Sequence, residues 1–240
     1  MARFFSKTKD DFKQDINYES VLNFFEERAK KAKILGYNQA VIYQDKNPEL
    51  ARKRDLIEKE ILLPKLKLTS KERLLDIGCG TGRWAETLEN LILYYHGIDA
   101  SQGLLNIAKS RFNNLKFSCI KANEISIETL KENELFDRVC CFGVLIYLND
   151  LEVKQTLQAV SNVIKRDGLF ILREPIGIKC RLTIKDHFST DMEQTYNAIY
   201  RTEQELFEDL ECFELIESDD LFDNNYIDYR PVDYQQYDTY

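Results

Sequence analysis

Hydrophobic and polar positions along this chain follow two alternating periods. Short apolar runs have the length and composition of buried strands, and the segments between them carry apolar residues every three or four positions, as amphipathic helices do. Such alternation predicts a parallel sheet with helices on both of its faces. The predicted strands lie near residues 73–77, 94–98, 115–120, 136–142 and 168–174.

The segment before the first predicted strand has the pattern of two helices. One covers residues 18–35, and the other covers residues 48–63 and begins after Asn47, a suitable N-cap. We therefore divide the chain into an N-terminal helical cap, or lid, at residues 1–64 and a core domain at residues 65–240.

The pattern is weaker toward both ends of the chain. Residues 1–17 are polar and are expected to be loosely held, and residues 175–201 are irregular and mixed in polarity. Thr202, with Glu205 three residues later, forms a capping box that predicts a short helix. Residues 213–217 have the pattern of a further strand. We expect the segment near 175–201 to be an insert that binds the substrate.

The most informative segment is a glycine loop after the first predicted strand. It reads Leu-Leu-Asp-Ile-Gly-Cys-Gly-Thr-Gly over residues 74–82. A dinucleotide site has the spacing G-x-G-x-x-G, whereas the third glycine here comes one residue early, at Gly82. Asp76 precedes the glycines, where a carboxylate repels a diphosphate and attracts an ammonium group. The loop predicts a nucleotide-type ligand with a cationic amino-acid end; the alternative is a tight strand–helix turn with no ligand.

A second acid supports this type of ligand. The next predicted strand ends at Asp99, about twenty residues beyond the glycine loop, where an acid accepts hydrogen bonds from both ribose hydroxyls. The alternative is that Asp99 caps the helix predicted at residues 101–111, a task that Ser101 also suits. The two interpretations are compatible.

Together these segments resemble the class I S-adenosylmethionine-dependent methyltransferases of the small-molecule type. Residues 74–82 are similar to the family motif hhD-hGxGxG, and residues 95–101 are similar to hhGhDhS. Residues 135–142 look like the family's fourth strand, and residues 165–171 look like its LKPGGxhhh segment, with an aspartate in place of one glycine. The resemblance covers residues 61–178.

The resemblance implies a fold and a cofactor. The expected fold is a Rossmann-like, doubly wound α/β fold with a seven-stranded sheet, mostly parallel with one antiparallel edge strand. The tail from Tyr226 alternates aromatic and polar residues and is expected to supply that edge strand. The implied cofactor is S-adenosyl-L-methionine, and the implied activity is methyl transfer.

The family's cofactor contacts can be assigned to the matching positions. Asp76 is expected to serve the methionine end and Asp99 the ribose. The usual adenine-binding aspartate has no clear equivalent; Asn123 offers an amide instead, and Glu124 is the alternate alignment. The expected cofactor-binding residues are Asp76, Gly78, Gly80, Gly82, Asp99, Ala100, Ser101, Asn123 and Phe142.

Candidate acceptor contacts lie in the less regular segments. Tyr147 stands where many relatives carry a histidine that faces the acceptor, although a core tyrosine fits equally well. Arg173 lies at the end of the fifth predicted strand, and an arginine there suits a phosphate or carboxylate; ordinary solvated charge is the alternative. Tyr43 belongs to a polar run that is expected to close over the pocket. The expected substrate-binding residues are Tyr43, Arg173, Arg181, Tyr200 and Arg201, and the expected catalytic residues are Tyr147 and His187. For His187, the alternative is a surface histidine or one whose hydrogen bonds are satisfied within the protein.

Composition limits the partners and the compartment. The formal net charge of −8 and the pI near 5.0 argue against a nucleic-acid backbone as partner. The six cysteines form no C-x-x-C pair and there are two histidines, so no metal site is expected. No apolar run approaches the length of a membrane span, and the N-terminus lacks the apolar core of a signal peptide. We therefore expect a cytoplasmic protein with no membrane partner.

The leading hypothesis is a methyltransferase that acts on a nitrogen or oxygen of a small polar, anionic metabolite. A phosphorylated amino alcohol and a sugar of a capsule or other surface-polysaccharide pathway are the acceptors considered. The alternative from another class is a cofactor-binding regulatory subunit without catalysis. A third hypothesis, a nicotinamide oxidoreductase, is disfavoured by the glycine spacing.

Overall fold

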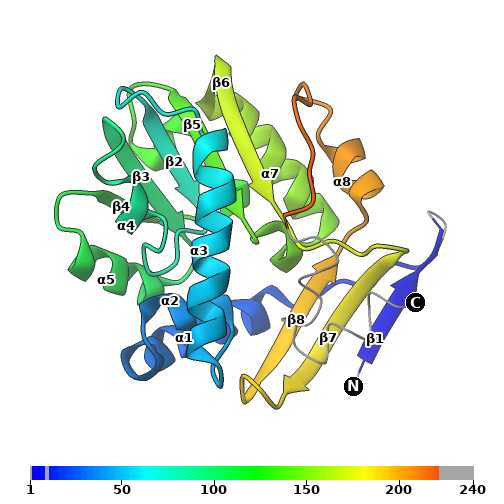
Figure 1. Ribbon diagram of the computed structural model, residues 1–240. Coiled ribbons are helices and arrows are strands. Elements are labelled where there is room, and N and C mark those ends of the chain that lie inside the picture. The colour runs from blue at the N-terminus through cyan, green and yellow to red at the C-terminus, as the bar shows by residue number, and fades with distance from the viewer. Residues whose placement is uncertain (1, 9–10, 222–240) are drawn as a thin grey trace.

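The computed structural model describes residues 2–8 and 11–221, and their strands form two sheets. The strands are β1 Ala2–Ser6, β2 Arg73–Ile77, β3 Tyr94–Asp99, β4 Lys116–Cys119, β5 Phe136–Phe142, β6 Ile164–Arg173, β7 Arg181–Ser189 and β8 Gln194–Tyr200. Five parallel strands form the central sheet in the order β4-β3-β2-β5-β6. Three antiparallel strands, in the order β1-β7-β8, form a separate sheet beside it (Figure 1).

The helices begin at residues that satisfy their first backbone N–H groups. Asn17 and Asn47 accept the N–H groups of Ser20 and Leu50, and the predicted capping box of Thr202 and Glu205 is confirmed. The helices are α1 Tyr18–Leu35, α2 Tyr37–Ile42, α3 Pro48–Lys65, α4 Ala85–Leu88, α5 Gln102–Arg111, α6 Ile127–Leu130, α7 Asp150–Val163 and α8 Glu203–Asp209, with 3₁₀ turns η1 Ala122–Glu124 and η2 Leu145–Tyr147.

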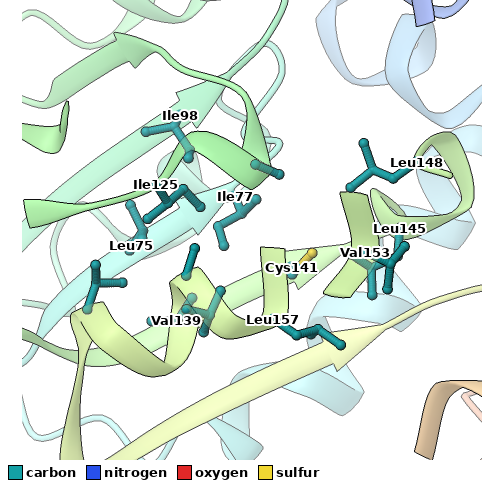
Figure 2. Packing of buried hydrophobic residues seen from close by; sticks show 14 of the residues in the cluster. Leu75, Ile77, Ile98, Ile125, Val139, Cys141, Leu145, Leu148, Val153 and Leu157 are labelled. Carbon is teal, nitrogen blue, oxygen red and sulfur yellow. The ribbon is translucent and has the colours of Figure 1, made fainter. Parts of the chain in front are cut away.

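The core follows from the two-residue period of the central strands. Neighbouring residues of a strand point to opposite faces of the sheet. Leu75 and Cys141 belong to one cluster with residues of α7, and Figure 2 shows Cys141 near Leu157 of that helix and Leu75 beside Ile125. Leu74 and Cys140 pack with residues of α3, α4 and α5 on the other face. The central sheet is therefore covered on both faces, as the sequence predicts.

The predicted seven-stranded sheet is wrong for the part of the chain that the structure describes. The five predicted core strands are present, but the central sheet has five strands and all are parallel. Residues 213–217 form no strand, because they are mostly exposed and pair with no neighbouring strand. The antiparallel edge strand expected from Tyr226 lies outside the described residues.

The segment near 175–201 is regular, contrary to the prediction. β7 and β8 form an antiparallel hairpin, and β1 pairs with β7, so the start of the chain is tied to this sheet. The register shifts between Ile184 and His187, and Asp186 has a φ of 50°. This irregularity interrupts the alternation of apolar and polar residues and hides the strand from a sequence pattern.

The N-terminal helices pack against both sheets. Phe24 and Phe25 of α1 contact Tyr196 of β8 and Tyr147 of η2 edge to face, with ring centroids 5.7 and 4.9 Å apart. Gly36 alone separates α1 from α2, because α2 already begins at Tyr37. In the described ranges, no helix has the length and hydropathy needed to cross a membrane.

Candidate cofactor and acceptor site

The carboxyl ends of the central strands open into one cavity of about 1630 Å³. This is the edge at which open α/β sheets bind ligands. Helices α1 and α3 and the inner face of the β1-β7-β8 sheet supply further walls. Of the predicted site residues, those that line the cavity are Tyr43, Asp76, Gly78, Gly80, Asp99, Ala100, Phe142, Tyr147, Arg173, His187 and Tyr200.

The glycine loop has a conformation that other residues cannot adopt without strain. Gly78, Gly80 and Gly82 have φ values of +72°, +55° and +81°. A Cβ on Gly78 would lie 2.3 Å from Val144 Cγ2, and one on Gly82 would lie 2.8 Å from the Phe112 ring. Gly82 does not line the cavity, so its role is close packing on α5, whereas Gly78 and Gly80 form the floor.

Asp99 is held by backbone groups on both of its oxygens. Oδ2 accepts the N–H of Gly80 at 2.9 Å, and Oδ1 accepts the N–H of Ser101 at 2.8 Å. Each carboxylate oxygen has further acceptor capacity, which suits two ribose hydroxyls. Burial raises the pKa of Asp99 to about 6, against the opposing effect of the two N–H donors. Ser101 caps α5 as predicted, but it is buried and does not line the cavity.

Replacing Asp99 with alanine is expected to weaken cofactor binding by about 1–3 kcal/mol, the scale of a lost hydrogen-bonded partner of a charged group. Titration with S-adenosylhomocysteine, followed by calorimetry, measures the change. Glu49→Ala is the control, because Glu49 is an exposed acid that does not line the cavity. An unchanged dissociation constant in Asp99→Ala would remove Asp99 from the site.

Asp76 is a buried carboxylate beside the glycine loop. Its Oδ2 accepts the Tyr95 hydroxyl at 2.5 Å. Burial raises the pKa of Asp76 to about 7, even though the Tyr95 hydroxyl and the charge of Arg83 act in the opposite direction. A ligand ammonium group would supply the missing positive charge and stabilise the ionised form.

Tyr18 is a cavity residue that the sequence pattern assigned only to a helix. It lines the cavity, and its buried hydroxyl has no hydrogen-bond partner in the structure. Burial, together with the charges of Glu124, Glu152 and Asp99, raises its pKa to about 12. An orphaned hydroxyl near Asp99, a glycine cradle and a buried acid fit a nucleoside joined to an amino acid. Among residues 2–8 and 11–221, no group of three His, Cys, Asp or Glu side chains is placed to hold a metal ion.

The predicted adenine contacts are not placed at the cavity. Asn123 lies in η1, where its amide donates to Gln155 Oε1 of α7 at 3.1 Å. Glu124 is exposed and lies 3.7 Å from Lys121 Nζ. Neither residue lines the cavity, whereas Ile120, Lys121 and Ala122 do. The backbone before η1 is therefore the better candidate for the adenine edge than the Asn123 side chain.

A buried glutamate shapes the loop after β5. Glu174 accepts the N–H groups of Val144, Leu145 and Ile146 at 2.7, 2.9 and 3.2 Å. Burial raises the pKa of Glu174 to about 7, and these three donors limit the rise. Glu174 thereby fixes η2 and with it Tyr147. No local sequence pattern reveals this role, because Val144 and Glu174 are 30 residues apart in the chain.

The predicted acceptor residues form an aromatic wall. Tyr147 is buried, and its ring lies 6.2 Å from that of Tyr196. The hydroxyls of Tyr196 and Tyr200 are 3.0 Å apart, and His187 is the register partner of Tyr196. Tyr43 has a left-handed conformation at the end of α2 and packs on Phe24. Tyr147 is therefore both a core residue and a cavity residue.

Arg173 lines the cavity, and a carboxylate of α3 binds one of its nitrogens. Its Nη2 donates to Glu58 Oε2 of α3 at 2.5 Å. Its Nη1 lies 3.0 Å from the place where a Cβ on Gly143 would stand, and its buried Nε has no hydrogen-bond partner in the structure. A guanidinium with an unused donor beside the cavity suits an anionic ligand group.

Arg181 and Arg201 have a different role from the predicted one. Both are 2% exposed and neither lines the cavity. Arg181 Nη2 and Arg201 Nη2 each donate to Asp150 Oδ1 at 2.8 Å. Arg201 also donates to the carbonyl oxygens of Leu145 and Leu148 at 2.8 and 2.7 Å. These arginines join the β7-β8 hairpin to α7 and η2 and are not available to a substrate.

Comparison with known proteins identifies the central domain. Residues 74–168 match the family model of a methyltransferase domain. The chain is 31% identical over 116 residues to the ubiquinone/menaquinone biosynthesis C-methyltransferase UbiE of Campylobacter jejuni, covering 45% of this chain and 47% of the relative. It is 29% identical over 139 residues to a malonyl-[acyl-carrier protein] O-methyltransferase of Bacillus anthracis, covering 56% of this chain and 49% of the relative.

A solved structure shares the fold. Phosphoethanolamine N-methyltransferase 1 of Haemonchus contortus, in complex with phosphoethanolamine and S-adenosylhomocysteine, superposes with a TM-score of 0.62 at 17% identity, covering 80% of this chain and 40% of that one. The chain spans about half the length of the curated relatives that it matches. This chain therefore contains a methyltransferase domain of the class I, S-adenosylmethionine-dependent type, and the cofactor of that domain is S-adenosylmethionine.

Proposed function

We propose that this chain transfers a methyl group from S-adenosylmethionine to a nitrogen or oxygen of a small polar acceptor that carries an anionic group. The observation that carries the proposal is the shared cavity. The cradle of Gly78, Gly80 and Asp99 and the cation of Arg173 line the same space. A cofactor and an acceptor bound there would both lie at the carboxyl ends of the central strands.

The work of this chain is mainly to orient the acceptor and exclude water. The cofactor supplies a methyl group on a sulfonium, which needs little further activation. Positioning alone lowers such a barrier by about 7–11 kcal/mol. Buried aromatic residues around Tyr147 exclude water from the same cavity. Tyr147 and His187 are the proposed residues for orienting the acceptor and receiving its proton, which an alcohol acceptor requires.

The acceptor class is inferred from the charges of the cavity. Arg173 favours a phosphate or carboxylate, because its planar guanidinium matches those groups. The names of the similar proteins indicate different acceptor atoms: one is a C-methyltransferase, one an O-methyltransferase and one an N-methyltransferase. A phosphorylated amino alcohol or a sugar of a polysaccharide pathway meets the requirement for a small anionic acceptor, and we propose these two classes first.

The N-terminal residues 1–64 are proposed as the cap over the bound ligands. Glu26 of α1 accepts the Ser101 hydroxyl at 2.8 Å and the N–H of Gly103 at 3.1 Å, next to the proposed ribose contact Asp99. Residues Tyr18 and Phe25 of the same helix line the cavity. Residues 175–201 are proposed as the acceptor wall.

Replacing Arg173 with alanine is expected to raise the acceptor KM at least about tenfold, because a charge-assisted hydrogen bond contributes about 1.5–3 kcal/mol. The dissociation constant for S-adenosylhomocysteine is expected to change by a smaller factor, because Arg173 reaches the residues after the glycine loop only through Glu58. Arg52→Ala is the control, since Arg52 is exposed and pairs only locally with Glu49. Equal loss of acceptor and cofactor binding would show that Arg173 is structural.

A labelled-methyl assay tests the function. The protein is incubated with S-adenosylmethionine carrying a radioactive methyl group and a panel of phosphoamines, sugar nucleotides and amino acids. Transfer of label to one class, with release of S-adenosylhomocysteine, is the expected result. Binding of the cofactor without transfer to any acceptor would favour the regulatory-subunit alternative. Tighter binding of a nicotinamide dinucleotide than of S-adenosylmethionine would contradict the proposal.

A further inference from the structure

One buried carboxylate joins the cofactor loop to the acceptor side of the cavity. The cofactor loop is the glycine loop together with the two residues that follow it, Arg83 and Trp84. Glu58 lies in α3, and its Oε1 accepts Arg83 Nη2 at 2.5 Å and Trp84 Nε1 at 3.2 Å. Arg83 and Trp84 directly follow the glycine loop in the chain. The second oxygen of Glu58, Oε2, accepts Arg173 Nη2 at 2.5 Å. Two functional regions that are about ninety residues apart in the chain thus depend on one side chain.

Glu58 carries its charge despite its burial. It is 6% exposed, and burial alone would raise its pKa. The guanidinium groups of Arg173 and Arg83 outweigh burial and hold the pKa of Glu58 at about 2. Asp55 bonds the other arm of Arg83 at 2.8 Å, with Lys59 as a further partner at 2.9 Å. Of the cofactor loop and Arg173, Asp55 therefore contacts only the loop, whereas Glu58 contacts both.

We propose that Glu58 is a positioning residue that couples anion binding at Arg173 to ligand binding at the cofactor loop. An anion that takes the unused Nε of Arg173 competes with Glu58 for the guanidinium charge. The response of Glu58 reaches Arg83 and Trp84, because both donate to its other oxygen. By linkage, the anion and the cofactor change each other's affinity by the same factor. The inference rests on the proposed function in one respect, that Arg173 receives the anionic group of the acceptor.

The chain contains a built-in reporter for this coupling. Trp84 is its single tryptophan, it lines the cavity, and its ring lies 4.9 Å from that of Phe142. Its fluorescence therefore reports on the cofactor loop without any need for turnover. Titrations with S-adenosylhomocysteine are compared in the absence and presence of saturating inorganic phosphate.

In the wild-type protein, phosphate is expected to change the dissociation constant of S-adenosylhomocysteine by about fivefold or more, within the usual range of coupling between sites. Glu58→Gln is expected to bring this ratio close to one. Asp55→Asn is the matched control and is expected to keep the wild-type ratio, because Asp55 bonds Arg83, whereas the carboxylate partner of Arg173 is Glu58. Arg173→Gln is also expected to bring the ratio to one, because it removes the guanidinium that binds both the anion and Glu58.

Thermal melts by circular dichroism show which variants are folded. Arg173→Gln carries the test if Glu58→Gln does not fold. A ratio of one in the wild-type protein, or an unchanged ratio in folded Glu58→Gln and Arg173→Gln, would overturn the coupling. The labelled-methyl assay separates the two proposals: methyl transfer with a wild-type ratio of one counts against the coupling, and intact coupling with no transfer to any acceptor counts against the proposed function.

Discussion

Replacing Gly78 with alanine is expected to abolish measurable cofactor binding and to lower the free energy of unfolding by about 2–5 kcal/mol. Two costs add at this position. A φ of +72° places a Cβ in the left-handed region, at about 1–2 kcal/mol. The new Cβ would also stand 2.3 Å from Val144 Cγ2, and relieving such an overlap costs about 1–3 kcal/mol.

The overlap, rather than φ alone, is expected to affect the cofactor. Val144 belongs to the loop that Glu174 holds, so relief of the overlap displaces either that loop or the floor formed by Gly78. Gly36→Ala is the matched control, because Gly36 also has a positive φ, +104°, but a Cβ there meets nothing within 4 Å. Chemical denaturation and S-adenosylhomocysteine titration measure both effects. Equal behaviour of the two variants would show that the overlap has no consequence.

The cofactor side of the site was predictable because its signals are local. Asp76, Gly78 and Gly80 lie within five consecutive residues, and their roles follow from the turn between a strand and the next helix. Asp99 was predicted from the end of the next strand, and that strand pairs with β2 in parallel. Local pattern and sheet topology together determine where these side chains meet.

The charges of the acceptor side were not predictable in the same way. Arg201 and its partner Asp150 are 51 residues apart in the chain. A sequence pattern shows that Arg173, Arg181 and Arg201 follow one another from the end of the fifth strand onward. It does not show that all three form ion pairs, or that of the three Arg173 also lines the cavity. Only the folded chain leaves Arg173 at the cavity and buries the other two.

Residues contributed by distant elements were missed for a related reason. Tyr18 and Glu58 come from helices that precede the core, and their sequence pattern predicts only a helix. Their place at the cavity depends on how α1 and α3 pack, which periodicity does not specify. The β7-β8 hairpin was missed because the irregularity at Asp186 breaks the two-residue alternation on which strand prediction depends.

The ligand-free protein is expected to be more stable at about pH 5.5 than at about pH 8. Burial raises the pKa of Asp76 to about 7, of Asp99 to about 6 and of Glu174 to about 7, all above the values of the unfolded chain. A raised acid binds its proton more tightly in the folded state. Its stabilising contribution is complete below the unfolded pKa and is lost as the pH rises through the folded pKa.

Two other buried groups act in the opposite direction. Burial, assisted by the charge of Lys116, lowers the pKa of His96 to about 4, so its contribution to stability is lost as the pH falls below the unfolded value of 6.5. The pKa of Glu58, about 2, adds a loss of stability only in more acidic solution, below about pH 4.5. Three raised acids outweigh one histidine between pH 8 and 5.5, and stability is expected to reach its maximum near the lower of these values.

S-adenosylmethionine is expected to reverse part of this dependence. Its ammonium group stabilises the ionised form of Asp76, so the cofactor binds more tightly at about pH 8 than at about pH 5.5, and its presence narrows the difference in melting temperature. Thermal melts with and without the cofactor at both pH values measure this. The asparagine in Asp76→Asn does not titrate. This variant therefore removes the contribution of Asp76 to the pH dependence of the melting temperature and to the pH dependence of cofactor binding. A ligand-free melting temperature that rises from pH 5.5 to pH 8 would show that these carboxyls are ionised in the folded protein, and that the cofactor does not have to displace a proton from Asp76 when it binds.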